Sequence, residues 1–329
     1  MSTIKVVIEQ LKKGNPVILI DDVETHSSYL MGLAETVTGQ YVNLMTKIGK
    51  GLKYVCINNR KTKQLNLPLM DGKNNPNKNF AISIDHHTST TGISAFERAN
   101  TIKAVMNEDS KPEDFIKPGH VFPLVYSDNG MLDYIGVVEA SADLAKISSS
   151  FSGITYLCEI LNKQGDVAAI HEVADISKEY NIPSIKITEI FKSMYNASIC
   201  TLDGKVVHGQ KLGRKLGYPT ANLDLYTSND CFKNGVYGVK VKWRGLTYFG
   251  VMNTGVKPTL NNNMQKSYEI HIFDFNHSIY GEEINVEVKF FIREEIKFCS
   301  INQLIQQIEK DIQKVKDTFE LQQKVKIGS

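Results

Sequence analysis

The hydrophobic pattern of the chain changes near residue 197, and this change constrains the fold more than any other feature of the sequence. Before it, short continuous apolar runs such as residues 16–22 and 79–85 alternate with helical patterns. Continuous apolar runs are typical of strands that are covered on both faces. After it, short runs alternate apolar and polar residues between turns, which indicates successive antiparallel strands. The sequence therefore predicts an α/β (α+β) domain over residues 1–196 and a β-rich domain over residues 197–329.

Each half contains a helix with a recognisable start. Ser94 followed by Glu97, and Ser300 followed by Gln303, are capping-box signatures, in which side chains bond the first backbone N–H groups of a helix. After Ser300, apolar residues recur at a period of 3.6 as far as Phe319. We therefore expect the second domain to end in an amphipathic helix.

The overall composition narrows the possible partners. The 329 residues carry a net charge of +2, which is too small to favour broad binding to nucleic acid or membranes. The five cysteines form no CxxC pair and are odd in number, which predicts reduced thiols. No apolar run is long enough for a signal peptide or a membrane span. We expect a cytoplasmic protein that binds neither nucleic acid nor membrane.

The stretch GQKLGRKLGYPTAN, residues 209–222, contains the strongest candidate site. Glycines recur at every fourth position with basic residues between them: Gly209, Gly213 and Gly217, with Lys211, Arg214 and Lys215. Glycines let backbone N–H groups approach an anion, while Thr220 and Asn222 offer oxygen ligands to Mg²⁺. The P-loop pattern GxxxxGK[ST] does not occur in the sequence. Spacing alone leaves two interpretations open, a phosphate-binding loop and an ordinary surface hairpin.

The motif GxxxGxxxGYPTAN resembles the nucleotide loop of the riboflavin kinase family. The segments GVYGVKV, VMNTGVKPT and YEIHIFDF follow in the order typical of that family, so the resemblance covers residues 198–320. It implies a small antiparallel Greek-key β-barrel with a C-terminal helix. It also implies an ATP-dependent and Mg²⁺-dependent phosphotransferase that converts riboflavin to FMN.

The resemblance also implies roles for individual residues. Thr220 and Asn222 become ligands of Mg²⁺–ATP, and Glu269 becomes the general base. The cofactor-binding residues are completed by the nucleotide loop and two later positions: Gly209, Gly213, Arg214, Gly217, Tyr218, Pro219, Asn253 and Arg293. Alternation along the strand places Tyr268 and Ile270 inward and Glu269 outward, where a solvated side chain is the alternative interpretation.

The first half resembles 3,4-dihydroxy-2-butanone-4-phosphate synthase, through HHTSTTGISAFERA, KPEDFIKPGHVFPL and EASADLA. The two positions that hold the metal in that family are Thr25 and Val137 here, and neither side chain replaces a carboxylate or an imidazole. Five polar residues of the implied pocket remain: Asp21, Asp22, His120, Glu139 and Glu159. We therefore expect metal-assisted chemistry to be lost, while binding of a sugar phosphate stays open.

Two smaller features of this half are ambiguous. The hydroxyl-rich loop from Thr88 to Ser94 precedes a helix, so it is either an anion site or a helix cap. His86 and His87 are adjacent on an expected strand and should point to opposite faces, which argues against a shared metal.

Three functions are compatible with these observations. The first is a riboflavin kinase fused to an inactive synthase-like domain that serves as a dimerisation or ligand-binding module, giving a homodimer through residues 1–196. The second adds an altered reaction of that domain on a flavin or a pentose phosphate. The third is a flavin-binding regulatory or scaffold protein, although no DNA-recognition helix pattern supports it.

Overall fold

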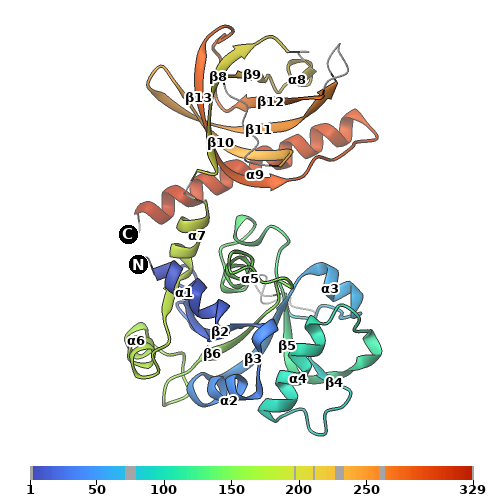
Figure 1. Ribbon diagram of the computed structural model, residues 1–329, viewed down its shortest axis with the longest axis vertical. Coiled ribbons are helices and arrows are strands. Elements are labelled where there is room, and N and C mark those ends of the chain that lie inside the picture. Colours follow the sequence, from blue (N-terminus) through green and yellow to red (C-terminus); the bar gives the residue numbers. More distant parts are fainter. Residues whose placement is uncertain are drawn as a thin grey trace. The chain divides into compact units, whose positions relative to one another are not determined.

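A computed structural model describes residues 3–70, 79–195, 198–209, 212–226, 233–258 and 264–327. The chain divides into two compact units, Met1–Ser193 and Met194–Ser329 (Figure 1). The predicted boundary between residues 196 and 197 falls outside the described residues. In the part of the chain that is described, no helix has the length and apolar character needed to cross a bilayer.

The first unit is built on a mixed seven-stranded sheet of order β4-β5-β3-β6-β2-β1-β7. Its strands are β1 (Val17–Ile20), β2 (Ser28–Leu33), β3 (Lys50–Ile57), β4 (Ile84–His86), β5 (Phe115–Val125), β6 (Thr155–Ile160) and β7 (Ser184–Lys186). Every residue of β1 and β2 is buried, as the continuous apolar runs predict. The α/β prediction is confirmed for this unit.

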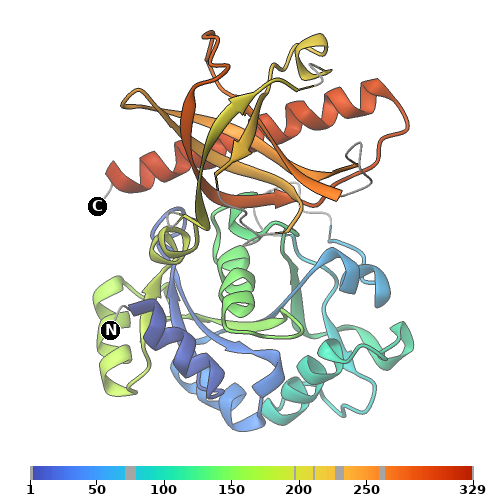
Figure 2. The same ribbon diagram turned by 45° about the horizontal axis from the view of Figure 1, so that its top comes forward.

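Helices cover both faces of this sheet (Figure 2). They are α1 (Thr3–Lys12), α2 (Gly39–Ile48), α3 (Asn59–Gln64), α4 (Ala95–Met106), α5 (Val137–Ile147), α6 (Ile170–Glu179) and α7 (Ile187–Tyr195), with 3-10 turns at Ala34–Thr36, Pro112–Asp114 and Gly130–Leu132. Ile102 and Val105 of α4 pack into one core with Val42 and Met45 of α2. This packing buries the apolar stripe of each amphipathic helix.

The second unit is a closed antiparallel barrel of order β10-β11-β12-β9-β8-β13. Its elements are β8 (Cys200–Val207), α8 (Leu212–Lys215), β9 (Ala221–Leu225), β10 (Gly235–Trp243), β11 (Leu246–Pro258), β12 (Met264–Ile272), β13 (Glu283–Arg293) and α9 (Ile301–Ile327). Phe319 of α9 packs on Phe249 of β11 and on Phe290 of β13, with ring centroids 4.4 Å and 5.1 Å apart. The predicted barrel with a C-terminal helix is confirmed.

The structure corrects two local expectations. Residues 79–85 are not one strand, because only Ile84–His86 forms β4, and Phe80 and Ala81 make isolated bridges. Ser300 caps α9 through the Gln303 N–H at 3.3 Å, but the Gln303 side chain accepts from Cys299 N rather than from Ser300 N. Helix α4, in contrast, carries the full capping box of Ser94 and Glu97.

Candidate active site

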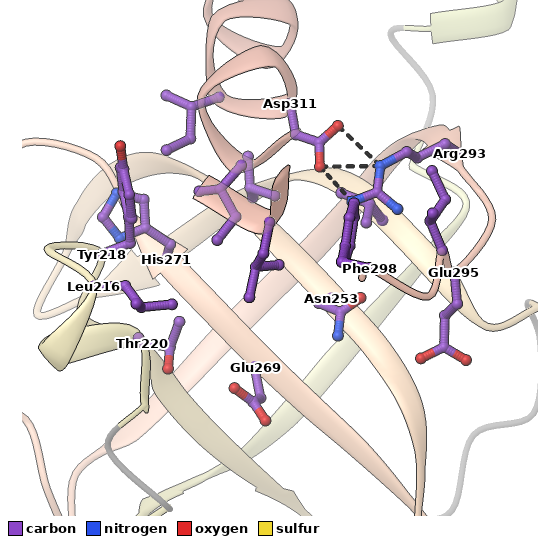
Figure 3. A pocket seen from close by; sticks show the side chains of 17 residues that line it. Leu216, Tyr218, Thr220, Asn253, Glu269, His271, Arg293, Glu295, Phe298 and Asp311 are labelled. Carbon is purple, nitrogen blue, oxygen red and sulfur yellow. Dashed lines mark hydrogen bonds and ion pairs between the residues drawn. The ribbon is translucent and has the colours of Figure 1, made fainter. Parts of the chain in front are cut away.

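The barrel unit contains a cavity of about 350 Å³ (Figure 3). Polar side chains line it from β11, β12 and the loop before β9, and apolar side chains line it from α9 and the segment before α9. In Figure 3, Thr220, Glu269 and Asn253 line one part of the wall, while Arg293 and Phe298 line another. The cavity therefore combines a polar region with an apolar one.

Strand pairing brings three of the predicted site residues into one row. Glu269 on β12 lies opposite Asn222 of β9 and opposite Asn253 of β11. Residues directly opposite one another in a sheet project to the same face. The neighbours Tyr268 and Ile270 are buried in the barrel core, so Glu269 projects away from that core, into the cavity. The predicted alternation of this strand is confirmed.

Thr220 stands where this cavity meets two smaller ones. A cavity of about 70 Å³ is lined by Arg214, His277 and Tyr280 as well as Thr220. A third, of about 20 Å³, is lined by Gly209, Asn222 and Thr220 among others. The two predicted metal ligands, Thr220 and Asn222, therefore lie at a junction between cavities, next to Glu269.

The glycines of the predicted nucleotide loop allow the chain to approach itself closely. A Cβ atom on Gly213 would lie 2.4 Å from the Tyr218 carbonyl oxygen, and one on Gly209 would lie 2.2 Å from Asn222 Nδ2. Gly217 has φ +90°, a backbone conformation that side chains disfavour. Lys211 lies outside the described residues. The glycine spacing thus serves the compactness of the loop.

The bend after Gly217 is held against β12. The Pro219 carbonyl oxygen lies 2.9 Å from His271 Nδ1, and the edge of the Tyr218 ring contacts the His271 ring. Tyr218 Oη also donates to Glu309 of α9 at 3.0 Å. These contacts fix the backbone directly before Thr220.

Arg293, one of the predicted cofactor-binding residues, forms an ion pair with Asp311 of α9. The guanidinium carbon lies 5.9 Å from the centre of the Phe298 ring. Sequence reasoning did not identify Asp311 or Glu309. The only available signal was that Asp311 lies next to Ile312 in the apolar repeat of the terminal helix.

In the first unit, Asp21 is enclosed by its own loop. Its carboxylate accepts from Val23 N and Glu24 N at 3.0 Å each, and from Thr25 N at 3.3 Å. Thr25 Oγ1 donates to it at 2.7 Å. Thr25, which we expect from the sequence at a metal position of the resembling family, therefore bonds a protein carboxylate.

The bonding continues across the sheet. Ser27 N donates to Thr25 Oγ1 at 3.4 Å, Ser27 Oγ donates to Tyr29 Oη at 3.1 Å, and Tyr29 Oη donates to Glu159 at 3.2 Å. Burial raises the pKa of Tyr29, which keeps its phenol a donor. Asp21 and Glu159 thus belong to one hydrogen-bonded chain of residues, which we call the hydroxyl chain (Asp21, Thr25, Ser27, Tyr29, Glu159).

Asp22 and Glu139 lie outside the hydroxyl chain, and their hydrogen bonding differs. Asp22 accepts from Thr188 N and from Thr188 Oγ1 at the start of α7. Glu139 lies in the first turn of α5, two residues after Val137, and is 7% exposed. Its Oε2 has no hydrogen-bond partner among the described residues, and burial raises its pKa from 4.5 to about 7. Val137 is itself buried.

His120 and Asp85 form a close pair. His120 Nδ1 lies 2.7 Å from Asp85 Oδ2, and the His120 N–H donates to Asp85 Oδ1 at 3.0 Å. The imidazole side chain is 43% exposed. Gly92 packs against both groups, since a Cβ atom there would lie 2.1 Å from Asp85 Oδ2.

The hydroxyl-rich loop is a helix cap. The Glu97 carboxylate accepts from Thr90 N at 2.6 Å, Thr90 Oγ1 at 2.9 Å and Ser94 Oγ at 2.9 Å. These bonds lower the pKa of Glu97 to about 2, and the bond from Thr90 N has the largest effect. The loop thus surrounds an anion, but the anion is the chain's own carboxylate.

The side chains of His86 and His87 do not point to opposite faces, although the expected strand alternation predicts that they do. The rings of His86 and His87 lie 4.4 Å apart, because β4 ends at His86 and the strand alternation stops there. Within the described residues, no group of three or more His, Cys, Asp or Glu side chains is arranged to hold a metal ion.

Comparison with known proteins identifies both units. A family model of 3,4-dihydroxy-2-butanone 4-phosphate synthase matches residues 5–193, and one of riboflavin kinase matches residues 197–319. A 3,4-dihydroxy-2-butanone 4-phosphate synthase from Oceanobacillus iheyensis is 37% identical over 193 residues, covering 58% of this chain and 93% of that protein. The crystal structure of the synthase from Candida albicans superposes with a TM-score of 0.53 at 27% identity, covering 58% of this chain and 96% of that one.

A longer relative shares only its first part. The riboflavin biosynthesis protein RibBA from Aquifex aeolicus is 37% identical over 198 residues, covering 58% of this chain and 48% of that protein. The chain thus spans about half the length of this relative.

Proposed function

Residues 5–193 of this chain belong to the 3,4-dihydroxy-2-butanone 4-phosphate synthase family and residues 197–319 are a riboflavin kinase domain, a phosphotransferase, and we propose that the chain converts riboflavin and ATP to FMN and ADP. The observation that carries the proposal is the convergence of Thr220, Asn222 and Glu269 where the cavities meet. Phosphoryl transfer requires positioning, charge neutralisation and a group that accepts the hydroxyl proton.

The three cavities divide between the two substrates. The larger cavity, with apolar side chains from α9, suits the isoalloxazine ring system of riboflavin. The smaller ones, lined by Arg214, Tyr280 and Gly209, suit phosphate groups of the nucleotide. The ribityl 5′-hydroxyl would then lie near Glu269, with the γ-phosphate near Thr220. We assign Gly213, Gly217, Tyr218, Pro219 and Asn253 to the walls that hold the two substrates.

In the reaction, Glu269 accepts the proton of the ribityl 5′-hydroxyl. The 5′-oxygen of riboflavin bonds the γ-phosphorus of ATP, while the bond between the γ-phosphorus and the bridging oxygen of the β-phosphate breaks and ADP leaves. The hydroxyl of Thr220 and the amide oxygen of Asn222 fit Mg²⁺, which favours a few protein oxygens together with phosphate oxygens. When bound, Mg²⁺ neutralises charge on the phosphates. The backbone of Pro219, held by His271, orients Thr220 toward this position.

For the first unit we propose that the synthase reaction is lost and that the unit is a dimerisation or ligand-binding module. Thr25 and Val137 provide no carboxylate or imidazole, and the hydroxyl chain engages Asp21 and Glu159. Similarity to a named synthase favours the alternative that the unit still acts on a pentose phosphate. We retain the predicted domains, residues 1–196 and 197–329, a homodimer through the first and a cytoplasmic location.

The kinase proposal is tested by incubating the full chain with riboflavin, ATP and Mg²⁺ and separating the flavins by chromatography. We expect FMN to appear together with an equal amount of ADP. Consumption of ATP without FMN, or no reaction by a folded chain that binds ATP, would show that the proposal is wrong.

The first unit is tested with ribulose 5-phosphate, with and without Mg²⁺. We expect neither formate nor a four-carbon phosphate, because Thr25 and Val137, at the two proposed metal positions, carry no carboxylate or imidazole. Formation of either product would support the alternative. Sedimentation of the chain measures the dimer separately.

A further inference from the structure

Asp311 is a buried acid on the apolar side of α9. It is 4% exposed, and Ile308 and Ile312, its near neighbours on the helix, line the same cavity. Burying a carboxylate has a large desolvation cost unless it is paired and hydrogen-bonded. The position therefore requires a specific partner.

The partner is Arg293, and the contact fixes the orientation of its guanidinium group. Arg293 Nε lies 3.0 Å and 3.1 Å from the two carboxylate oxygens of Asp311, and Nη2 lies 2.7 Å from Oδ2. Nη1 donates to the Glu294 carbonyl at 2.9 Å. Gln307 Nε2 donates to Asp311 Oδ1 at 2.9 Å, which holds the carboxylate in turn. Bidentate pairing of this kind fixes geometry as well as charge.

The arrangement leaves part of the guanidinium group for a ligand. A guanidinium carries five N–H groups. Within the described residues, Asp311 and Glu294 engage three of those of Arg293, so that one N–H on Nη1 and one on Nη2 remain. Arg293 lines the cavity and is 19% exposed.

We propose that Asp311 is a positioning residue for riboflavin, a role that rests on the proposed kinase function. Asp311 holds the plane of Arg293 so that its remaining N–H groups meet carbonyl oxygens of the isoalloxazine ring. Charge-assisted hydrogen bonds of fixed direction are stronger than those of a mobile side chain. Asp311 acts through Arg293 and contacts no substrate itself.

Stability alone does not account for the pair. Replacing a buried ion pair by apolar residues is often neutral or stabilising, so a buried pair is weak evidence for a purely structural role. The apolar residues that flank Asp311 on α9 show that the helix face accepts them. A guanidinium group of fixed orientation in the wall of a cavity can donate hydrogen bonds to a polar aromatic ligand.

The test measures the two substrates separately in the full chain. Asp311→Asn keeps the shape of the side chain but loses the charge and one acceptor. We expect the KM for riboflavin to rise roughly 10-fold, the size expected for weakening one charge-assisted hydrogen bond. The KM for ATP and kcat should change less than about 2-fold. Asp311→Glu, which retains the carboxylate, should recover part of the affinity.

The control is a second helix pair of the same spacing. Gln313 donates to Asp317 at 2.8 Å, as Gln307 donates to Asp311, but Asp317 is exposed. Asp317→Asn should leave both KM values unchanged. Arg293→Lys should raise the KM for riboflavin, and Arg293→Lys with Asp311→Asn should raise it no further. Arg293→Lys keeps the test valid if Asp311→Asn does not fold.

Three outcomes would overturn the proposal: an unchanged KM for riboflavin in a folded Asp311→Asn chain, an equal rise in both KM values, or additive effects of Arg293→Lys and Asp311→Asn. Direct titration of riboflavin, followed by quenching of its fluorescence, separates this inference from the proposed function. A chain that forms no FMN, but loses riboflavin affinity through Asp311→Asn, would contradict the kinase function alone.

Discussion

The two units use similar polar residues in opposite ways. In the barrel unit, Glu269 and Thr220 line a cavity of about 350 Å³. In the first unit, Asp21 and Glu159 are members of the hydroxyl chain, in which neighbouring side chains and backbone groups donate to them. A carboxylate therefore indicates chemistry only together with the surface that it faces.

The two glycine-containing and hydroxyl-containing loops show the same contrast. The loop that ends in Thr220 borders three cavities. The loop from Thr88 to Ser94 closes around the carboxylate of Glu97. Both loops could bind an anion by their composition, but the first borders cavities while the second already bonds the carboxylate of Glu97.

Replacing the proposed base should have the largest effect. We expect Glu269→Gln to lower the rate of FMN formation by roughly 10²–10⁴-fold, the usual contribution of a positioned general base. The KM for ATP should change much less, since the proposed nucleotide site lies at the smaller cavities, which Glu269 does not line. Rates are measured by chromatography of the flavin products.

The control for this variant is Glu283→Gln. Glu283 is an exposed residue of the same barrel and accepts from Tyr226 Oη at 2.7 Å. Its replacement should leave the rate within a few-fold of the original. If Glu269→Gln lowers the rate of FMN formation no more than Glu283→Gln does, the assignment of the base is wrong. The contrast between a carboxylate that faces a cavity and one that is bonded by its neighbours would then not indicate catalysis.

In the first unit, replacing Glu139 should have the largest effect, and the effect is on the free energy of unfolding. Burial raises its pKa from 4.5 to about 7, so the folded state binds the proton more tightly than the unfolded state. Its contribution to stability is complete below pH 4.5 and is lost as the pH rises through 7. Glu139→Gln removes this loss, and we expect the first unit to be more stable at pH 8 by up to about 3 kcal/mol.

The measurement follows urea unfolding by far-UV circular dichroism at pH 5 and pH 8. Trp243, the single tryptophan of the chain, lies in β10 of the barrel unit, so its fluorescence reports on the other unit and should not change. Glu9→Gln, at an exposed position of α1, is the control. A gain that is equal at both pH values would contradict the explanation by burial.

Asn222 should have a smaller effect, restricted to the metal. We expect Asn222→Ala to raise the Mg²⁺ concentration needed for half-maximal rate by about 10-fold, because it removes one of the two proposed oxygen ligands. Asn285→Ala is matched, since Asn285 is a half-buried barrel residue that donates to Asp203 at 2.8 Å. An unchanged Mg²⁺ requirement would remove Asn222 from the proposed metal site.

Sequence patterns predicted the barrel unit well because alternation follows directly from strand geometry. Tyr268 and Ile270 point inward and Glu269 outward, and the register then sets Glu269 beside Asn222 and Asn253. The cavity wall formed by α9 was not predicted. Asp311 and Arg293 are 18 residues apart, and only the packing of α9 on the barrel brings them together.

In the first unit, the absence of a carboxylate or imidazole at Thr25 and Val137 stays a prediction about a metal site, and the sequence did not indicate the bonds that Thr25 makes. Nothing in a string of hydroxyl residues shows that Thr25 bonds Asp21 or that Tyr29 reaches Glu159, 130 positions away. The rings of His86 and His87 lie together because a strand ends between them, and strand ends are the least predictable feature of a sequence.

The smallest expected effect tests whether the Thr88–Ser94 loop is a cap. Ser94 Oγ accepts from Glu97 N at 3.2 Å, so Ser94→Ala should speed hydrogen exchange in the first turn of α4 by roughly 5-fold. Helix α2, capped by Thr38 through Tyr41 N at 3.2 Å, is the internal control and should not change. Added inorganic phosphate should not slow exchange in the variant, because the Glu97 carboxylate still occupies the loop. Protection by phosphate would instead show that the loop binds external anions, and the contrast between the two loops would disappear.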